Sequence, residues 1–324
     1  MRRVHAKLEE WSPAVFLGYN SIAFDENLMR QAFYQTLQPI YVTNTSGNAR
    51  GDVMRIVHAA SIFAPNVIVV PLSDKGRRTF RLDTLAPANG FAHEDAHEAM
   101  ADVEATIHMS QLIRDRAPEI WSTMIDHSSK QNTVRFIEDK DVIALANVSG
   151  GNSHTRLVTH CGSNPDYDAE TAVFDLSFSP DDYLGLSTHE LLAVLEGRTK
   201  PIRVVRTNSQ PILMPEAMAQ EDTTGADLSS DVIERRVSQI RSNESFRSRV
   251  GQALAKRYAD GEPSPYVEKK MYDAFPSKPD EAIMSEFQTA DWQGRLELAK
   301  RLSDLRLRDL ARRLIYCEKP ELLS

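Results

Sequence analysis

The sequence predicts three consecutive regions: an α/β region, a β-rich region and a helical region. Three observations support this order. The apolar run "AVFLGYN" (14–20) is followed by segments with helical spacing, short apolar runs separated by turn residues fill about 132–212, and residues 292–316 are strongly helical. Strands that alternate with helices are typical of α/β domains. Several short strands in succession are typical of a barrel or a curled sheet. We set the boundaries at 1–122, 123–275 and 276–324, and the middle region includes a helical extension.

The α/β region begins with a buried strand at 14–20. Residues 25–37 form the next element, a helix, because their apolar side chains recur at helical spacing. A second helix is predicted at 52–63, with Asp52 as its N-cap. An apolar stretch at 66–72, a short helix at 79–90 and a long helix at 94–116 follow; the long helix is acidic at its start and basic at its end, as the helix dipole favours.

The β-rich region contains five short runs: "TVRFI", "DVIALANVSG", "TRLVTHCG", "TAVFDLSF" and "IRVVRTNSQPILMP". Turn residues separate them, which favours a small barrel or a curled sheet. Residues 213–250 become helical, and 220–230 is the best candidate for an exposed loop. Basic residues at 200, 203 and 206 either line a groove for a single strand or form a solvated surface.

Composition excludes several classes of protein. The chain has 324 residues, a net charge of −8 and 41% apolar residues, and no apolar run approaches the roughly 18 residues that span a bilayer. Its charged start, "MRRVHAKLEEW", is not a secretory signal. The two cysteines form no CxxC motif, so we expect neither a disulfide framework nor a thiolate zinc site, and we expect a cytoplasmic location. The acidic total argues only weakly against nucleic-acid binding, which depends on local charge.

Two motifs carry the functional prediction. "GYNSIAFDENLMR" places Asn20 and Asp25 where a strand turns into a helix, and "HEAMADVEATIHM" places His97 and Asp102 near the start of another helix. Together they resemble the second and third motifs of the DnaQ-like 3′-to-5′ exonucleases of the DEDDh group. "TFRLDTLAPANGFAHEDAHEAMADVEATI" and "KPIRVVRTNSQPIL" extend the resemblance to the exodeoxyribonuclease I family over nearly the whole chain.

The resemblance implies an RNase H-like exonuclease domain, then an SH3-like barrel and a helical domain. It also implies degradation of single-stranded DNA from the 3′ end to 5′-mononucleotides, in DNA repair and recombination. In that family two Mg²⁺ ions steady the attacking and leaving oxygens, and a histidine takes the proton of the attacking water. On this basis Asp25 and Asp102 are metal ligands and His97 is the general base. An N-cap is the alternative role for Asp25.

The resemblance further places Asn20, Arg55 and Arg81 near the DNA. Packing or a turn hydrogen bond is the alternative for Asn20, and a surface ion pair is the alternative for the two arginines. The partners implied are single-stranded DNA and single-stranded DNA-binding protein, with no membrane.

One motif of the family is missing. The DEDDh group takes two further carboxylates from a D-x-E motif on its first strand, but no D-x-E precedes Asn20. Asp168 and Glu170 have the spacing but lie in a turn-rich part of the middle region. We therefore expect an exodeoxyribonuclease I that lacks its N-terminal motif and its C-terminal end, and that is almost inactive. The alternatives are a fragment that binds single-stranded DNA without cutting it and a fragment that does not fold alone.

Overall fold

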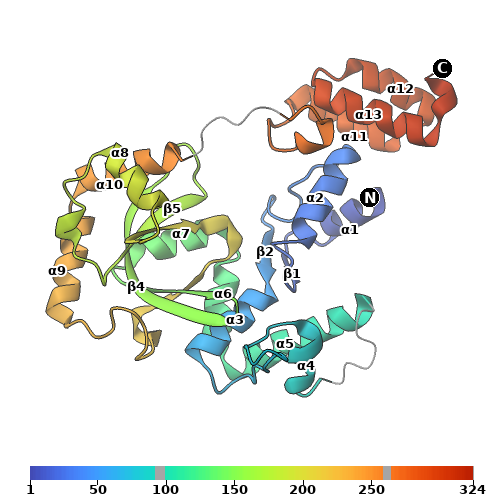
Figure 1. Ribbon diagram of the computed structural model, residues 1–324. Coiled ribbons are helices and arrows are strands. Elements are labelled where there is room, and N and C mark those ends of the chain that lie inside the picture. Colours follow the sequence, from blue (N-terminus) through green and yellow to red (C-terminus); the bar gives the residue numbers. More distant parts are fainter. Residues whose placement is uncertain (92–98, 258–263, 324) are drawn as a thin grey trace. The chain divides into compact units, whose positions relative to one another are not determined.

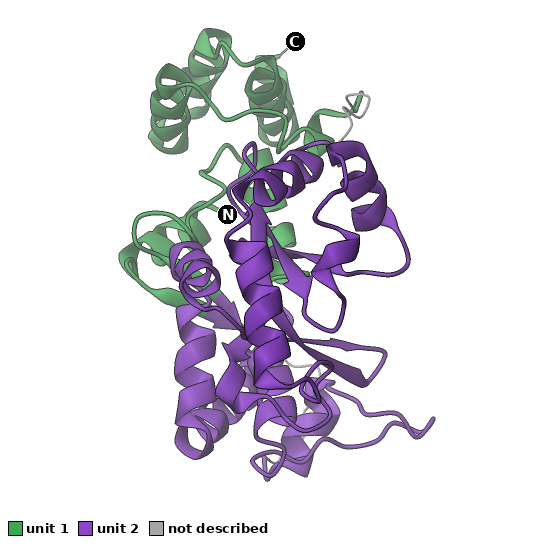
Figure 2. Ribbon diagram, turned by 90° about the vertical axis from the view of Figure 1, so that its left-hand side faces the viewer, with its two compact units in different colours: residues 1–16, 21–50, 260–324 green, residues 17–20, 51–259 purple. Residues whose placement is uncertain are grey.

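The computed structural model describes residues 1–91, 99–257 and 264–323 (Figure 1). The chain divides into two compact units (Figure 2). Unit 1 comprises residues 1–16, 21–50 and 260–324, and unit 2 comprises residues 17–20 and 51–259. A two-stranded sheet, β1 (Val15–Gly18) and β2 (Ala49–Asp52), contributes residues to both units.

Unit 1 is helical and brings together distant parts of the sequence. Its helices are α1 (Arg2–Glu10), α2 (Asp25–Gln35), α11 (Lys278–Thr289), α12 (Trp292–Arg301) and α13 (Leu305–Glu318), with 3₁₀ turns Val267–Lys269 and Pro320–Leu322. Tyr34, in the last turn of α2, and Leu37, just after the helix, are buried in one core with Phe287 and Leu310. The Gln288 side chain donates to the carbonyl of Leu37 at 2.9 Å. Segments about 250 residues apart therefore share a core.

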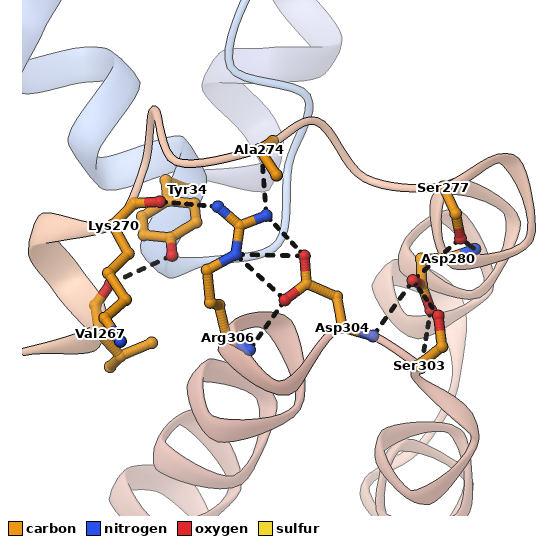
Figure 3. Close-up of polar contacts among 9 residues, drawn as sticks. All are labelled: Tyr34, Val267, Lys270, Ala274, Ser277, Asp280, Ser303, Asp304 and Arg306. Atoms are coloured by element: carbon orange, nitrogen blue, oxygen red, sulfur yellow. Dashed lines mark hydrogen bonds and ion pairs between the residues drawn. The ribbon is translucent and has the colours of Figure 1, made fainter. Parts of the chain in front are cut away.

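A network of polar side chains fixes the loop that precedes α11 (Figure 3). The Arg306 guanidinium donates to the carbonyls of Lys270 and Ala274 and pairs with Asp304, which caps α13. Asp280 is buried and accepts from the backbone of Ser303 at 2.7 Å. Because Arg306 and Asp280 satisfy backbone groups of neighbouring segments, they hold the loop and the start of α13 in place.

Unit 2 contains eight helices among its described residues. They are α3 (Val53–Phe63), α4 (Leu82–Ala88), α5 (Ala99–Arg116), α6 (Pro118–Asp126), α7 (Lys130–Asp139), α8 (Thr188–Glu196), α9 (Ser230–Arg241) and α10 (Glu244–Ala255), with 3₁₀ turns Pro180–Asp182, Thr207–Ser209 and Glu216–Met218. Helix α3 is apolar nearly all round and packs against α5 and α6, as expected for a buried helix.

The sheet of unit 2 is antiparallel, with strand order β6-β5-β4-β3-β7. Its strands are β3 (Ile143–Ser149), β4 (Asn152–Ser163), β5 (Glu170–Asp175), β6 (Ile202–Arg206) and β7 (Ile212–Pro215). Helices α9 and α10 pack on β4, and a second apolar cluster covers the other face with Ile137 of α7. In the described residues β6 and β7 do not pair with each other, so the sheet stays open and the expected closed barrel is not seen.

Most predicted helices are confirmed. Those at 25–37, 52–63 and 79–90 appear as α2, α3 and α4. The strand predicted within 133–137 is wrong, because these residues lie inside helix α7. Its β-branched residues favour a strand, but Thr133, Phe136 and Ile137 also recur at helical spacing, and the Ser129 side chain caps the helix. The apolar stretch at 66–72 forms no strand and contributes one isolated bridge at Leu72.

Candidate active site

The turn after β1 is held by a buried aspartate of another segment. Asn20 adopts a left-handed conformation with φ of 56°. Its backbone N–H donates to Oδ1 of Asp52 at 2.7 Å, and the same oxygen accepts from the N–H of Met54 at 3.1 Å. The Tyr19 hydroxyl donates to the carbonyl of Phe80, and burial raises the pKa of Tyr19. Asp52 is therefore both the predicted N-cap of α3 and the anchor of the Asn20 turn.

Gln210 extends this network into the sheet region. Its side-chain oxygen accepts from the Asp52 N–H at 2.6 Å, and its side-chain nitrogen donates to the Met124 carbonyl at 2.8 Å. Gln210 is buried and left-handed, with φ of 47°. Gly51 leaves the room for this contact, because a Cβ there would lie 2.6 Å from Leu17 and 3.1 Å from the Gln210 amide. No sequence pattern singles out Gln210, since only the fold brings residues 52, 124 and 210 together.

Asp25 is the first residue of α2 and is exposed. The N-cap position belongs to Phe24, and no side chain caps the helix. The alternative role of Asp25 as an N-cap is therefore wrong. Within the described part of the chain the Asp25 carboxylate has no hydrogen-bond or ion-pair partner, so its oxygens are available to a ligand.

Asp102 lies in the first turn of α5 and is exposed. Met100, Val103 and Ile107 flank it as an exposed apolar stripe, and they are 66%, 51% and 50% exposed. Asp102 belongs to unit 2, whereas Asp25 belongs to unit 1. His97 lies outside the described residues, and its role stays a prediction. Among residues 1–91, 99–257 and 264–323 no three His, Cys, Asp or Glu side chains gather as a metal site.

Arg55 and Arg81 differ in their surroundings. Arg55 follows Asp52 by three residues on α3 and is half-buried; burial lowers its pKa, and Asp52 opposes this effect. Arg81 is exposed and pairs with Asp83 at 2.5 Å, which raises its pKa. The surface ion pair weighed for Arg81 is therefore present. Contact of either arginine with DNA stays a prediction.

The two acidic residues of the D-x-E sequence in the middle region, Asp168 and Glu170, each form an ion pair within the protein. Asp168 is exposed and pairs with Lys130 at 2.6 Å. Glu170 is buried and pairs with Arg257 at 3.3 Å. One carboxylate faces solvent and the other is buried with its own cation, so the two do not form a shared metal site.

Known proteins similar to this chain are exodeoxyribonucleases I. The chain is 28% identical over 287 residues to exodeoxyribonuclease I of Haemophilus influenzae, covering 83% of this chain and 60% of the relative. The Escherichia coli exodeoxyribonuclease I is also 28% identical, over 285 residues, with 83% and 59% covered. The resemblance to exodeoxyribonuclease I is confirmed. No protein-family model matches the chain.

Solved structures agree. E. coli exonuclease I in complex with a dA16 oligonucleotide superposes with a TM-score of 0.83 at 25% identity, covering all of this chain and 72% of that one. A structure described as SSB/exonuclease I in complex with the inhibitor CFAM gives a TM-score of 0.80 at 25% identity, covering all of this chain and 70% of that one. The chain spans about 60% of the length of its exodeoxyribonuclease I relatives. No described helix is long and apolar enough to cross a membrane.

Proposed function

We propose that the chain is part of a 3′-to-5′ exodeoxyribonuclease that degrades single-stranded DNA to 5′-mononucleotides, in repair and recombination. The observation that carries the proposal is the likeness to exodeoxyribonuclease I over 83% of the chain, together with the superposition on E. coli exonuclease I bound to an oligonucleotide. The proposal includes an RNase H-like domain, an SH3-like region and the start of a helical domain, with the predicted boundaries. A cytoplasmic location goes with it.

Asp25 and Asp102 would hold divalent metal, with Mg²⁺ as the proposed ion. Both carboxylates are exposed and present the oxygen ligands that Mg²⁺ prefers. When bound, such ions stabilise the charge that develops on the phosphate during hydrolysis. His97 would take the proton of the attacking water. Two carboxylates are fewer oxygen ligands than the DEDDh group supplies, so we expect the D-x-E motif to be needed for turnover.

Asn20, Arg55 and Arg81 are proposed to position the strand. The hydrogen bond from the Asn20 N–H to Asp52 fixes the turn, so the Asn20 side chain extends from a rigid backbone. Arg55 supplies positive charge from the first turn of α3. Single-stranded DNA-binding protein is a proposed partner, supported by the SSB/exonuclease I neighbour.

One observation favours a second function, the holding of single-stranded DNA without cleavage. No D-x-E motif precedes Asn20, and the D-x-E at 168–170 is engaged in separate ion pairs. Residues 1–324 taken alone supply two of the four carboxylates that the DEDDh group uses, and by themselves they would hold DNA through the proposed contacts without cleaving it.

The two functions separate in one assay. Purified chain is mixed with 3′-labelled or 5′-labelled oligo(dT), with Mg²⁺ or with EDTA, and both binding and mononucleotide release are measured. Binding without release supports the second function. Release that requires Mg²⁺ and is abolished in Asp25→Asn and Asp102→Asn supports the first and shows that the D-x-E motif is dispensable. Absence of binding contradicts both.

A further inference from the structure

The sheet of unit 2 carries an ion triad on three neighbouring strands. Arg156 lies on β4, Asp175 ends β5 and Arg203 lies on β6. The Nε atoms of Arg156 and Arg203 contact the same oxygen, Oδ2 of Asp175, at 3.1 and 3.4 Å. The two guanidinium groups are therefore neighbours, held together by one carboxylate.

Asp175 has no remaining capacity for other ligands. Its side chain is 1% exposed, and its second oxygen, Oδ1, accepts from the backbone and the hydroxyl of Ser177 at 3.1 and 2.6 Å. A buried carboxylate with both oxygens engaged is a fixed anchor. The buried Asp175 carboxylate consequently holds both arginine side chains in a fixed orientation.

The arginines, by contrast, keep their outer nitrogens available. Their side chains are 21% and 25% exposed. Across the described ranges neither the Nη1 nor the Nη2 atoms of Arg156 and Arg203 donate to a protein group. The terminal fork of a guanidinium matches two oxygens of a phosphate. The triad thus presents two forks at one place on the surface.

The triad also has surplus positive charge. Two cations share one anion, and burial together with the neighbouring Arg156 lowers the pKa of Arg203. Side chains alternate along a strand, so Arg156, Asp175 and Arg203 share the face of Val158, Val173 and Val205, which belong to the apolar cluster. The same alternation places no other Asp or Glu of the five strands on this face. An oxyanion between the forks would offset the repulsion.

We propose that Arg156 and Arg203, oriented by Asp175, form a phosphate clamp that binds a backbone phosphodiester of single-stranded DNA. The clamp rests on the proposed function for its ligand, and it deepens that function by adding a contact in the sheet region. A purely structural ion triad would stabilise the sheet but would not distinguish phosphate from other anions.

The test compares variants of equal charge. Arg156→Gln and Arg203→Gln each remove one charge from the clamp, and Arg235→Gln removes one from an exposed position on α9, outside the clamp. The affinity for fluorescein-labelled oligo(dT) is measured by anisotropy at several salt concentrations. We expect each clamp variant to bind about tenfold more weakly at 0.1 M salt, with a salt slope lower by roughly 0.7 per lost phosphate contact, and Arg235→Gln to change little.

A gentler variant guards against loss of the fold. Arg156→Lys with Arg203→Lys keeps the pairing with Asp175 but removes both forks, so melting should be nearly unchanged while affinity falls several-fold. If the lysine and glutamine variants all bind like Arg235→Gln while the native chain binds DNA, the clamp is refuted.

A second measurement separates the clamp from the proposed function. The melting temperature is compared in inorganic phosphate and in chloride at equal ionic strength. If the native chain binds no oligonucleotide, yet phosphate stabilises it more than the lysine variant, the proposed function fails and the phosphate site stands. Equal stabilisation of both proteins, with no oligonucleotide binding, overturns the site as well.

Discussion

Replacement of Asp52 by alanine is the sharpest test of how the candidate site is held. The change removes the cap of α3, which typically costs about 0.5–2 kcal/mol. It also leaves the Asn20 N–H without its acceptor in a part-buried turn, and an unpaired buried donor costs about 1–3 kcal/mol. Because one Oδ1 atom serves both groups, a single substitution removes both bonds. We expect unit 2 to lose about 2–4 kcal/mol of its free energy of unfolding.

The assay follows unit 2 alone. The three tryptophans are Trp11, Trp121 and Trp292, of which only Trp121 belongs to unit 2. In a Trp11→Phe, Trp292→Phe background, Trp121 fluorescence during urea unfolding reports on that unit. The free energy of unfolding is then obtained for the native residue and for Asp52→Ala by linear extrapolation.

The matched control is Asn243→Ala. Asn243 caps α10 in the same unit, and its side chain accepts only from Phe246 at 2.9 Å among the described hydrogen bonds. We expect it to cost about 1 kcal/mol, as the loss of a cap alone does. If Asp52→Ala costs no more than this control, the Asn20 turn does not depend on Asp52 and the reasoning fails.

Three further predictions concern other parts of the chain. Gly51→Ala should lower the free energy of unfolding of unit 2 by about 1 kcal/mol, since its Cβ would lie 3.1 Å from the Gln210 amide, which its bonds to Asp52 and Met124 hold in place; no cost in urea unfolding would contradict the close packing. Burial lowers the pKa of His127 to about 4, so the unfolded chain binds a proton first as the pH falls from about 6.5 toward 4. His127 alone should account for about 1–2 kcal/mol of the stability lost between pH 7 and pH 5. Burial also lowers the pKa of His58 and His160 to about 4, so His127→Gln, measured by urea unfolding at both values, should still lose stability, but less by that amount. His97→Ala in an enzyme completed with the D-x-E motif should lower turnover at least about 10²-fold with DNA affinity kept; near-normal turnover would remove the general-base role.

The sequence predicts the helices of the α/β region well because their signals are local. Asp52 precedes an apolar helical pattern and does cap α3, where its side chain accepts from Met54. The error at 133–137 has the opposite cause. Residue preferences there favour a strand, while the cap at Ser129 and the burial of Ile137 against the sheet decide for a helix. The strand preference of this five-residue run is therefore outweighed by the cap and by the packing of Ile137 together.

The candidate site is only partly predictable for the same reason. Residue type and resemblance single out Asp25 and Asp102, and both are exposed in the structure. The support for the Asn20 turn could not be found this way, since Gln210 lies 158 residues from Asp52. An amide side chain in a loop carries no sequence signal for such a bond. Long-range supports of this kind emerge only when the fold is known.

The aspartates of this chain differ in burial and in the partners of their carboxylate oxygens. Asp175 and Asp280 are buried, and each has both oxygens engaged by side-chain or backbone donors. Their oxygens already accept hydrogen bonds or ion pairs inside the protein, so neither carboxylate is available to bind an added cation. Asp25 is exposed, stands one residue past the cap position and binds no other described group. A helix needs nothing from a carboxylate placed there beyond a favourable dipole interaction. We proposed Asp25 as a metal ligand, and on that proposal Asp25→Asn should weaken divalent-metal binding while leaving the unfolding of unit 1 nearly unchanged; unchanged metal binding would contradict the role.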